Sequence, residues 1–224
     1  MDPRAHTIIA IDGPAASGKS SAGRLLAERL GLAFLDTGAM YRAVALRVLE
    51  AGGDPEDGEL CTRIARSLAL DYDAHGHILI DGQPGEPAIR APAVSRAASP
   101  VALHPGVRAA LVAKQQELGQ RQSLVAEGRD TTTVVFPFAR PKFFLWATPR
   151  TRAQRRAAEL GEPERVQEIE AKLAARDERD STRAVGPLRQ ADDAIRLDTD
   201  GMSLEEVVEE LLQHARAALE ADEA

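Results

Sequence analysis

Residues 7 to 20 read Thr7-Ile-Ile-Ala-Ile-Asp-Gly-Pro-Ala-Ala-Ser-Gly-Lys-Ser20, an apolar β-branched run followed by a glycine-rich loop. From Gly13 to Ser20 the spacing matches G-x-x-x-x-G-K-[S/T], in which backbone N–H groups surround phosphate oxygens. The apolar run predicts a buried strand, and residues 20–30 predict a helix whose N-terminus adds positive potential at the loop. A glycine-rich turn that matched by chance would not also have this strand before it and this helix after it. We therefore predict a P-loop.

The P-loop predicts which residues hold a nucleoside triphosphate. Lys19 would neutralise the transferred phosphoryl group, and Ser20 would hold Mg²⁺. The residues expected to bind ATP are Gly13, Pro14, Ala15, Ala16, Ser17, Gly18, Lys19, Ser20 and Ser21. A P-loop alone does not define a reaction, because GTPases, ATP-driven machines and small kinases share it. The chain has no asparagine, so the N-K-x-D motif of GTPases is excluded, and 224 residues leave little room for a motor ATPase.

Short apolar runs alternate with helical patterns along the rest of the chain. Further strands are predicted at 33–35, 123–126, 142–146 and 194–197, and helices at 40–51, 107–121, 150–159 and 166–183. This alternation predicts a three-layer α/β fold of the P-loop kinase type, a five-stranded parallel sheet with flanking helices. A helix at 61–70 precedes a short strand at 77–80, and the Asp81-Gly82 turn after it predicts a small antiparallel insert. Ser203 and Glu206 form a capping box before the last helix.

Composition limits the classes of protein that the chain can belong to. The net charge of −7 argues against a nucleic-acid partner. The single cysteine, Cys61, excludes an internal disulfide and is expected to be a small buried residue. No apolar run approaches the ~20 residues of a membrane span, so we expect a cytoplasmic protein without membrane contact. The basic residues are nearly all arginine, which suits phosphate recognition but is explained as well by a compositional bias of the source genome.

Several charged residues are candidates for a second phosphate site. Arg176, Arg179, Asp180 and Arg183 are spaced i, i+3, i+4 and i+7, so a helix would place them on one face. Such a face can hold phosphate groups and donate to a transition state whose charge spreads over oxygens. The spacing alone slightly favours the alternative of a solvated charged face.

Two more groups lie where strands are expected to end. Glu127 and the pair Arg129-Asp130 follow a predicted core strand, at the sheet edge where ligands bind in open α/β folds. Glu127 could hold a Mg²⁺-bound water there. Arg42 lies one turn into a helix that opens after Asp36-Thr-Gly38, and a helix start can hold a phosphate. A strand-end salt bridge, an N-cap and a surface arginine explain these residues equally well.

Taken together, these motifs resemble those of the bacterial cytidylate (CMP) kinases. They occur in the family's order and span nearly the whole chain: Ile11-Asp-Gly-Pro14 with the P-loop, Leu35-Asp-Thr-Gly-Ala-Met-Tyr-Arg42, Ser99, Val107-Arg108, Glu127-Gly-Arg-Asp130, Val134-Val-Phe-Pro137 and Arg176 through Pro187. The stretch from residue 60 to 92 also resembles the enlarged monophosphate-binding region of this family.

The resemblance implies a role for each matching residue. The acceptor phosphate would be held by Thr37, Arg42, Arg129 and Arg183. The cytosine edge would be contacted by Ser99, Arg108 and Asp130. The pentose and the phosphates would be near Arg176 and Asp180. The implied catalytic residues are Lys19, Arg129, Arg176 and Arg183, and the implied metal ligands are Ser20 and Glu127.

The implied reaction is ATP + CMP (or dCMP) ⇌ ADP + CDP (or dCDP), with Mg²⁺. We expect one domain with its core at 1–36, 109–147 and 164–224, a monophosphate-binding insert at about 37–108 and a short lid at about 148–163. The expected partners are nucleotides only, and the chain is expected to act as a monomer. The alternatives are a kinase for UMP or AMP and a non-catalytic nucleotide-binding module.

The chain departs from the family's pattern at three places. Arg129-Asp130 is followed by Thr131-Thr-Thr133, where the family usually has a glycine at the middle position. Threonine, unlike glycine, does not tolerate positive φ, so Thr132 is incompatible with a loop that needs that conformation. Phe138 and Trp146 stand where an aspartate is usual.

Overall fold

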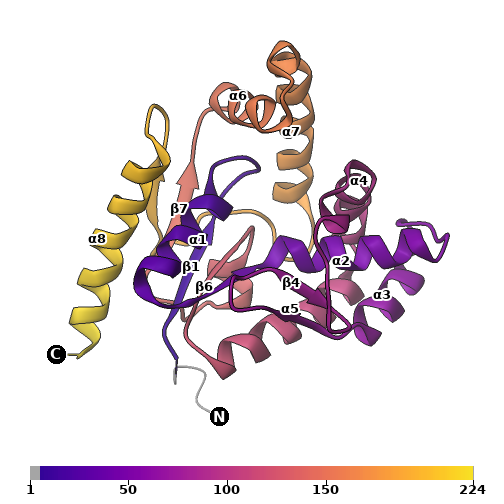
Figure 1. The fold of residues 1–224 in the computed structure, drawn as a ribbon, viewed down its shortest axis with the longest axis horizontal. Helices are drawn as coiled ribbons and strands as arrows, with labels where there is room; N and C mark the ends of the chain where they lie inside the picture. Colours follow the sequence, from indigo (N-terminus) through magenta and orange to yellow (C-terminus); the bar gives the residue numbers. More distant parts are fainter. Residues whose placement is uncertain (1–5, 224) are drawn as a thin grey trace. The chain divides into compact units, whose positions relative to one another are not determined.

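The computed structural model describes residues 6–223, with side chains described as far as residue 220 (Figure 1). The chain forms two compact units, Ala33–Leu124 in one and Thr7–Leu32 with Val125–Ala224 in the other. The main sheet has five strands in the order β2-β6-β1-β7-β8, and a separate three-stranded sheet has the order β3-β4-β5. The predicted α/β class, five-stranded parallel sheet and antiparallel insert are confirmed.

The unit made of Thr7–Leu32 and Val125–Ala224 contains the P-loop. Its strands are β1 (Ile8–Asp12), most of β6 (Leu124–Gly128), β7 (Lys142–Trp146) and β8 (Ile195–Asp198). The strand β7 pairs in parallel with β1 on one side and with β8 on the other. Every residue of β1 and β6 is buried, as expected for parallel strands that are covered on both faces. The P-loop and the loop after β6 therefore start from rigid, buried strands.

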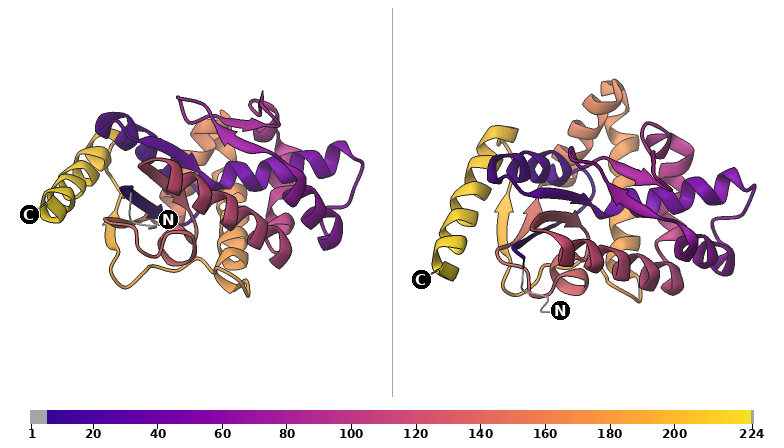
Figure 2. Two further views of the ribbon diagram at one scale, coloured as in Figure 1. Left: turned by 90° about the horizontal axis from the view of Figure 1, so that it is seen from below. Right: turned by 60° about the horizontal axis from the view of Figure 1, so that its bottom comes forward.

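Four longer helices belong to this unit: α1 (Lys19–Leu30), α6 (Pro149–Leu160), α7 (Val166–Thr182) and α8 (Leu204–Glu223). Helix α8 runs beside α1 (Figure 2). The predicted capping box is present at the start of α8, where Ser203 N donates to Glu206 Oε2 at 2.8 Å and Glu206 N donates to Ser203 Oγ at 3.3 Å. None of the helices described is both long and apolar enough to cross a membrane.

Helices α6 and α7 form an adjacent pair, joined through Gly161 and the short helix η3 (Pro163–Arg165) (Figure 1). Gly161 ends α6 with a φ of 69°, a conformation that glycine adopts without steric cost. The pair packs an apolar cluster against the P-loop. The buried members of this cluster are Ala15, Ala153, Ala157, Ile169 and Leu173.

The unit Ala33–Leu124 begins with β2 (Ala33–Asp36) and continues through the insert. Its other elements are α2 (Thr37–Glu50), α3 (Gly58–Ser67), β3 (Leu70–Tyr72), β4 (Ile78–Ile80), β5 (Gln83–Pro84), η1 (Ala88–Arg90), α4 (Pro92–Val101) and α5 (Pro105–Arg121). Within it, α2 packs on α4 and α3 packs on α5. The turn from β4 to β5 has φ of 53° at Asp81 and 77° at Gly82, which are the two positive values that a tight hairpin needs.

In this unit one predicted helix ends early and one helix was not predicted. The helix expected to reach Leu70 ends at Ser67, because Ala69 N donates to Asp81 Oδ1 and Leu70 pairs with Ile80 in the small sheet. Helix α4 was not predicted, because its prolines look like breaks in the sequence. Pro92 is tolerated because it is the first residue of the helix, where no intrahelical N–H bond is lost.

The two aromatic residues that depart from the family's pattern are held by other contacts. Phe138 packs edge-on against Phe136, with ring centroids 6.1 Å apart. Trp146 stacks under Arg196 of the neighbouring strand, with the guanidinium carbon 4.9 Å from the ring centroid, a cation–π contact. Both aromatic side chains are therefore accommodated by local packing.

Candidate active site

The P-loop conformation depends on Gly13 and Gly18, the two glycines at the fixed positions of the motif. A Cβ on Gly13 would lie 2.1 Å from the carbonyl oxygen of Leu145 on β7, so only glycine allows the backbone to pass there. Gly18 forms the N-cap of α1 with φ 90°, and Ala16 has φ 59°. Positive φ at alternate positions turns successive N–H groups toward one side of a loop, the arrangement that binds phosphate.

Lys19 is buried within this loop. Its Nζ donates to the carbonyl oxygen of Pro14 at 2.7 Å and to Ser17 Oγ at 3.3 Å. Burial, followed by the nearby positive charge of Arg129, lowers the pKa of Lys19 to about 7. A phosphate oxygen beside Nζ would favour the charged form of the amine. The site is therefore electrostatically complementary to an anion.

Ser20 and Glu127, the two predicted metal ligands, lie in direct contact. Ser20 Oγ donates to Glu127 Oε1 at 2.8 Å, which joins the start of α1 to the end of β6. In the part of the chain that is described, no group of three or more His, Cys, Asp or Glu side chains could hold a metal alone. Mg²⁺ usually takes only one or two protein oxygens and completes its shell with phosphates and water, so this pair fits it.

Asp177 and Arg152 form hydrogen bonds with the P-loop backbone at Ala15, and neither residue was predicted to do so. Asp177 Oδ1 accepts from Ala15 N at 3.0 Å, and Arg152 donates to the Ala15 carbonyl oxygen at 3.0 Å and also to Asp177. Nothing local in the sequence indicates this contact, because 162 residues separate Asp177 from Ala15.

The predicted acceptor residues of this unit form two ion pairs that are largely shielded from solvent. Arg129 Nε donates to Asp180 Oδ2 at 3.0 Å, and Arg183 donates to Asp130 Oδ1 at 3.2 Å. The side chains of Arg183 and Asp130 are only 5% and 8% exposed, so the solvated face is wrong as a description of this pair. Paired and largely buried charges hold a fixed geometry, which suits recognition of a charged ligand.

The other two arginines of α7 differ from each other. Arg176 is half-buried on the helix. Arg179 is exposed and donates to the carbonyl oxygen of Ala175 in its own helix at 3.1 Å. Arg179 therefore behaves as the solvated residue that the alternative describes.

The loop after Asp130 is a π-helical turn, Thr131–Val135, in which Thr132 fits without strain. Ala16 and Asp81 are the non-glycine residues described with positive φ, so Thr132 does not need glycine's conformational freedom. The incompatibility expected at Thr132 does not arise. Its hydroxyl instead donates to Asp12 Oδ2 at 2.6 Å.

In the unit Ala33–Leu124, a buried aspartate gathers two arginines at the start of α2. Asp36 is the N-cap of this helix and accepts from Ala39 N at 2.9 Å. Asp36 Oδ2 also accepts from Arg42 at 2.7 Å and from Arg90 of η1 at 3.2 Å. The Arg42 Nε atom is buried and has no hydrogen-bond partner, so it remains available to a ligand. Arg90 was not predicted, because nothing in the sequence near it resembles a phosphate motif.

The remaining predicted residues of this unit lie on three helices. Thr37 is the buried first residue of α2. Ser99 lies half-buried on α4. Arg108, on α5, is 1% exposed and its guanidinium carbon lies 5.7 Å from the centroid of the Tyr41 ring. Their roles toward the acceptor stay predictions.

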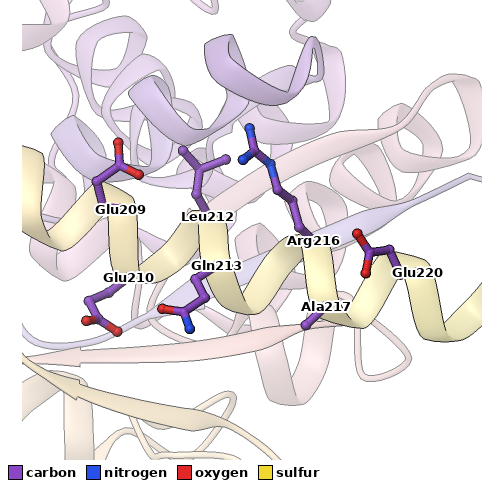
Figure 3. A pocket seen from close by; sticks show the side chains of 7 residues that line it. All are labelled: Glu209, Glu210, Leu212, Gln213, Arg216, Ala217 and Glu220. Carbon is purple, nitrogen blue, oxygen red and sulfur yellow. The ribbon is translucent and has the colours of Figure 1, made fainter.

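A shallow hollow on the surface of α8 contains none of the predicted site residues (Figure 3). It is lined by Glu209, Glu210, Leu212, Gln213, Arg216, Ala217 and Glu220. Figure 3 shows Glu209, Leu212 and Arg216 directed to one side of the helix and Glu210 and Gln213 to the other. Glu209 forms an ion pair with Arg29 of α1, so this region lies beside the contact between two helices.

The fold and the site together define the class. The parallel sheet has a P-loop after its first strand, and that loop contains a buried lysine. Ser20 at the start of α1 contacts Glu127 at the end of β6, the strand beside β1. These features are those of a P-loop protein of the nucleotide-kinase type. The particular family follows from sequence comparison. The family model for cytidylate kinase matches residues 9–217, and this chain belongs to that family.

Curated relatives are similar over most of this chain. A bifunctional pantoate ligase/cytidylate kinase of Synechococcus sp. (strain CC9311) is 49% identical over 212 residues, 91% of this chain and 43% of that protein. A cytidylate kinase of Solibacter usitatus (strain Ellin6076) is 46% identical over 217 residues, 95% of this chain and 93% of that one. The chain therefore spans less than half the length of the bifunctional relatives it matches.

Among solved structures, a gluconokinase of Sinorhizobium meliloti 1021 aligns over 96% of this chain and 95% of that one, with 18% identity and a TM-score of 0.48. That likeness is too remote to inform the choice of substrate.

Proposed function

We propose that this protein transfers the γ-phosphoryl group of ATP to CMP and dCMP, giving ADP with CDP or dCDP. The observation that carries the proposal is the pair of buried ion pairs Arg129–Asp180 and Arg183–Asp130, at the end of the strand next to the P-loop strand. A non-catalytic nucleotide-binding module would need only the P-loop. A set of buried, oriented arginines beside it suits a second phosphate-bearing substrate.

On the donor side, the N–H groups of the loop Gly13–Ser20 would bind the ATP phosphates, and Lys19 would neutralise charge that develops on the transferred group. Ser20 and Glu127 would hold Mg²⁺, which would supply charge neutralisation for the phosphates of ATP. The contacts of Arg152 and Asp177 with Ala15 would keep the loop in its binding conformation.

On the acceptor side, Arg42, Arg129 and Arg183, with Thr37, would hold the phosphate of CMP. Arg176 and Asp180 would lie near the pentose. Ser99, Arg108 and Asp130 would contact the cytosine edge. Phosphoryl transfer requires little covalent chemistry from the protein, so positioning and charge neutralisation would carry the rate without a dedicated general base.

The proposal extends to organisation and location. Residues of about 37–108 would form the monophosphate-binding insert, and residues of about 148–163 a lid whose closure excludes water from the transferred phosphoryl group. The protein would act as a monomer on free nucleotides in the cytoplasm, where thiols such as that of Cys61 stay reduced.

An acceptor panel tests the proposal. Purified protein with ATP and Mg²⁺ is supplied with CMP, dCMP, UMP or AMP, and ADP release is followed in a coupled assay. CMP and dCMP are expected to give the highest kcat/KM. A preference for UMP or AMP would replace the substrate assignment, and no turnover with any acceptor would favour a non-catalytic nucleotide-binding module.

Asp130→Asn is expected to lower kcat/KM for CMP and to narrow the ratio of CMP to UMP activity. Cytosine presents a 4-amino donor that a carboxylate accepts, whereas uracil presents a carbonyl that a carboxylate repels. The amide adds a donor that suits uracil. Steady-state kinetics with both acceptors measure the ratio. Equal losses for CMP and UMP would make Asp130 only the ion-pair partner of Arg183, and base choice would then rest on Ser99 and Arg108.

Asp180→Ala is expected to affect CMP and dCMP unequally if its carboxylate contacts the sugar as well as Arg129. If the carboxylate accepts from the 2′-hydroxyl, it distinguishes CMP from dCMP, because deoxyribose lacks that hydroxyl. The kcat/KM values for both acceptors give the answer. Equal losses would show that Asp180 acts solely by orienting Arg129, the contact seen at 3.0 Å.

A further inference from the structure

Asp12, the last residue of β1, has a fully buried carboxylate that accepts four hydrogen bonds from the loop segment Thr131-Thr132. Its Oδ1 accepts from Thr131 N at 2.9 Å and from Thr131 Oγ1 at 2.7 Å. Its Oδ2 accepts from Thr132 N at 2.8 Å and from Thr132 Oγ1 at 2.6 Å. Both threonines are themselves buried, at 0% and 1% exposure, so water cannot replace either hydroxyl at low cost.

These four hydrogen bonds stabilise a buried carboxylate. An ionised carboxylate with no water around it must be compensated by donors or by a cation. Lys19 is close enough for the two charges to interact, and the remaining stabilisation comes from the N–H and O–H groups of Thr131 and Thr132. Hydrogen bonds to a charged acceptor are about twice as strong as neutral ones, so the position of this segment is tightly determined.

The place of this contact in the chain gives it a role beyond stability. Asp12 directly precedes Gly13 of the P-loop, and Thr131 directly follows Asp130. The carbonyl oxygen of Asp130 accepts from Val134 N at 2.9 Å and from Val135 N at 3.2 Å, which closes the π-helical turn behind it. One carboxylate therefore joins the loop that would hold ATP to the residues that would hold the acceptor.

We propose that Asp12, through the hydroxyls of Thr131 and Thr132, positions Arg129 and Asp130 relative to the P-loop and so sets how well the acceptor base is selected. In this proposal all three are positioning residues, which act through Arg129 and Asp130. Thr132, which replaces a glycine usual in related sequences, supplies one of the four bonds through a hydroxyl that glycine lacks. The inference rests on the proposed function, since it concerns the same acceptor.

The test separates the hydroxyls from the backbone donors. Thr132→Val and Thr131→Val keep the shape and the N–H bond and remove one O–H donor each, while Thr132→Ser retains the donor. Thr133→Val in the same loop is the matched control, because the Thr133 hydroxyl is buried and makes no hydrogen bond. For each protein, kcat and KM are measured for CMP, UMP and ATP, with Tm recorded in parallel.

Thr132→Val is expected to raise KM for CMP about tenfold, the effect of losing one hydrogen bond to a charged group, and to narrow the CMP to UMP ratio. KM for ATP should stay within about twofold, and Thr132→Ser should restore the CMP values, since a buried charge loses its donor only in the valine variant. If Thr132→Val fails to fold, the same split is expected between Thr132→Gly and Thr132→Ser, because glycine also lacks the hydroxyl.

Two results would overturn this inference, and they differ from each other. If the wild-type protein phosphorylates CMP, and the variants lose Tm while CMP, UMP and ATP parameters change together or not at all, the contact is only structural. If the wild-type protein phosphorylates no monophosphate, the proposed function fails and this inference fails with it.

Discussion

Lys19→Ala is expected to lower kcat by about 10²–10³-fold, the effect of removing a preorganised charge from a transition state. The ammonium group would neutralise negative charge as it develops on the transferred phosphoryl oxygens. Tm of the nucleotide-free protein should not fall, because the amine is buried and burial penalises its charged form, as its lowered pKa of about 7 indicates.

The control for this variant is Lys172→Ala. Lys172 lies on α7 with its side chain 65% exposed, paired with Glu168, so its removal should leave kcat unchanged. Single-turnover and steady-state measurements of ADP release distinguish a slower chemical step from weaker ATP binding. A Lys19→Ala protein with kcat near that of the wild type would remove the P-loop from the catalytic step.

Arg183→Ala and Arg42→Ala are each expected to lower kcat/KM for CMP by roughly 100-fold, because each removes a guanidinium that would bind the acceptor phosphate more strongly in the transition state. Arg183 is held rigidly by bonds to the Gly186 carbonyl oxygen at 2.5 Å and to Asp130. Arg42 is held by Asp36, and its buried Nε remains free to donate. KM for ATP should change little in either variant.

Arg179→Ala is the matched control for Arg183→Ala, since both arginines belong to the same predicted face. Arg179 is exposed and bonds to its own helix, so its loss should change kcat/KM by less than about threefold. Acceptor kinetics at saturating ATP provide the comparison. If Arg183→Ala and Arg42→Ala both behaved like Arg179→Ala, the two arginines would not bind the acceptor phosphate and the acceptor site would lie elsewhere.

The sequence was sufficient to predict the elements whose signals lie within a few neighbouring residues. The P-loop takes part of its conformation from neighbouring residues, since Ala16 and Gly18 both have positive φ. The strand β7 was predicted at its observed bounds, Lys142–Trp146, because a buried parallel strand is a continuous apolar run. The capping box at Ser203 was equally visible.

The contacts that could not be predicted join distant parts of the chain. Asp12 meets Thr131 across 119 residues, and Asp177 meets Ala15 across 162. Each is a carboxylate that accepts backbone N–H bonds, and sequence spacing contains no signal for such a pair. The same holds for Arg90, which reaches Asp36 only because η1 packs against α2.

The effect of Thr132 was misjudged for a related reason. The sequence shows a threonine where a glycine is usual and suggests a conflict with positive φ. The structure forms a π-helical turn there, and the hydroxyl finds the buried carboxylate of Asp12. Whether a substitution strains a loop depends on which partner the new side chain reaches, and that partner comes from a distant strand.

A competition experiment tests the central claim most directly. The protein is incubated with ATP, Mg²⁺ and equimolar CMP, UMP and isotopically labelled AMP, and the nucleotides are separated and identified by mass as the reaction proceeds. The account predicts that CDP forms first and that its amount equals the unlabelled ADP formed beyond any hydrolysis measured without acceptor. Unlabelled ADP formed without a nucleoside diphosphate from any of the three acceptors, or UDP or labelled ADP formed ahead of CDP, would contradict it.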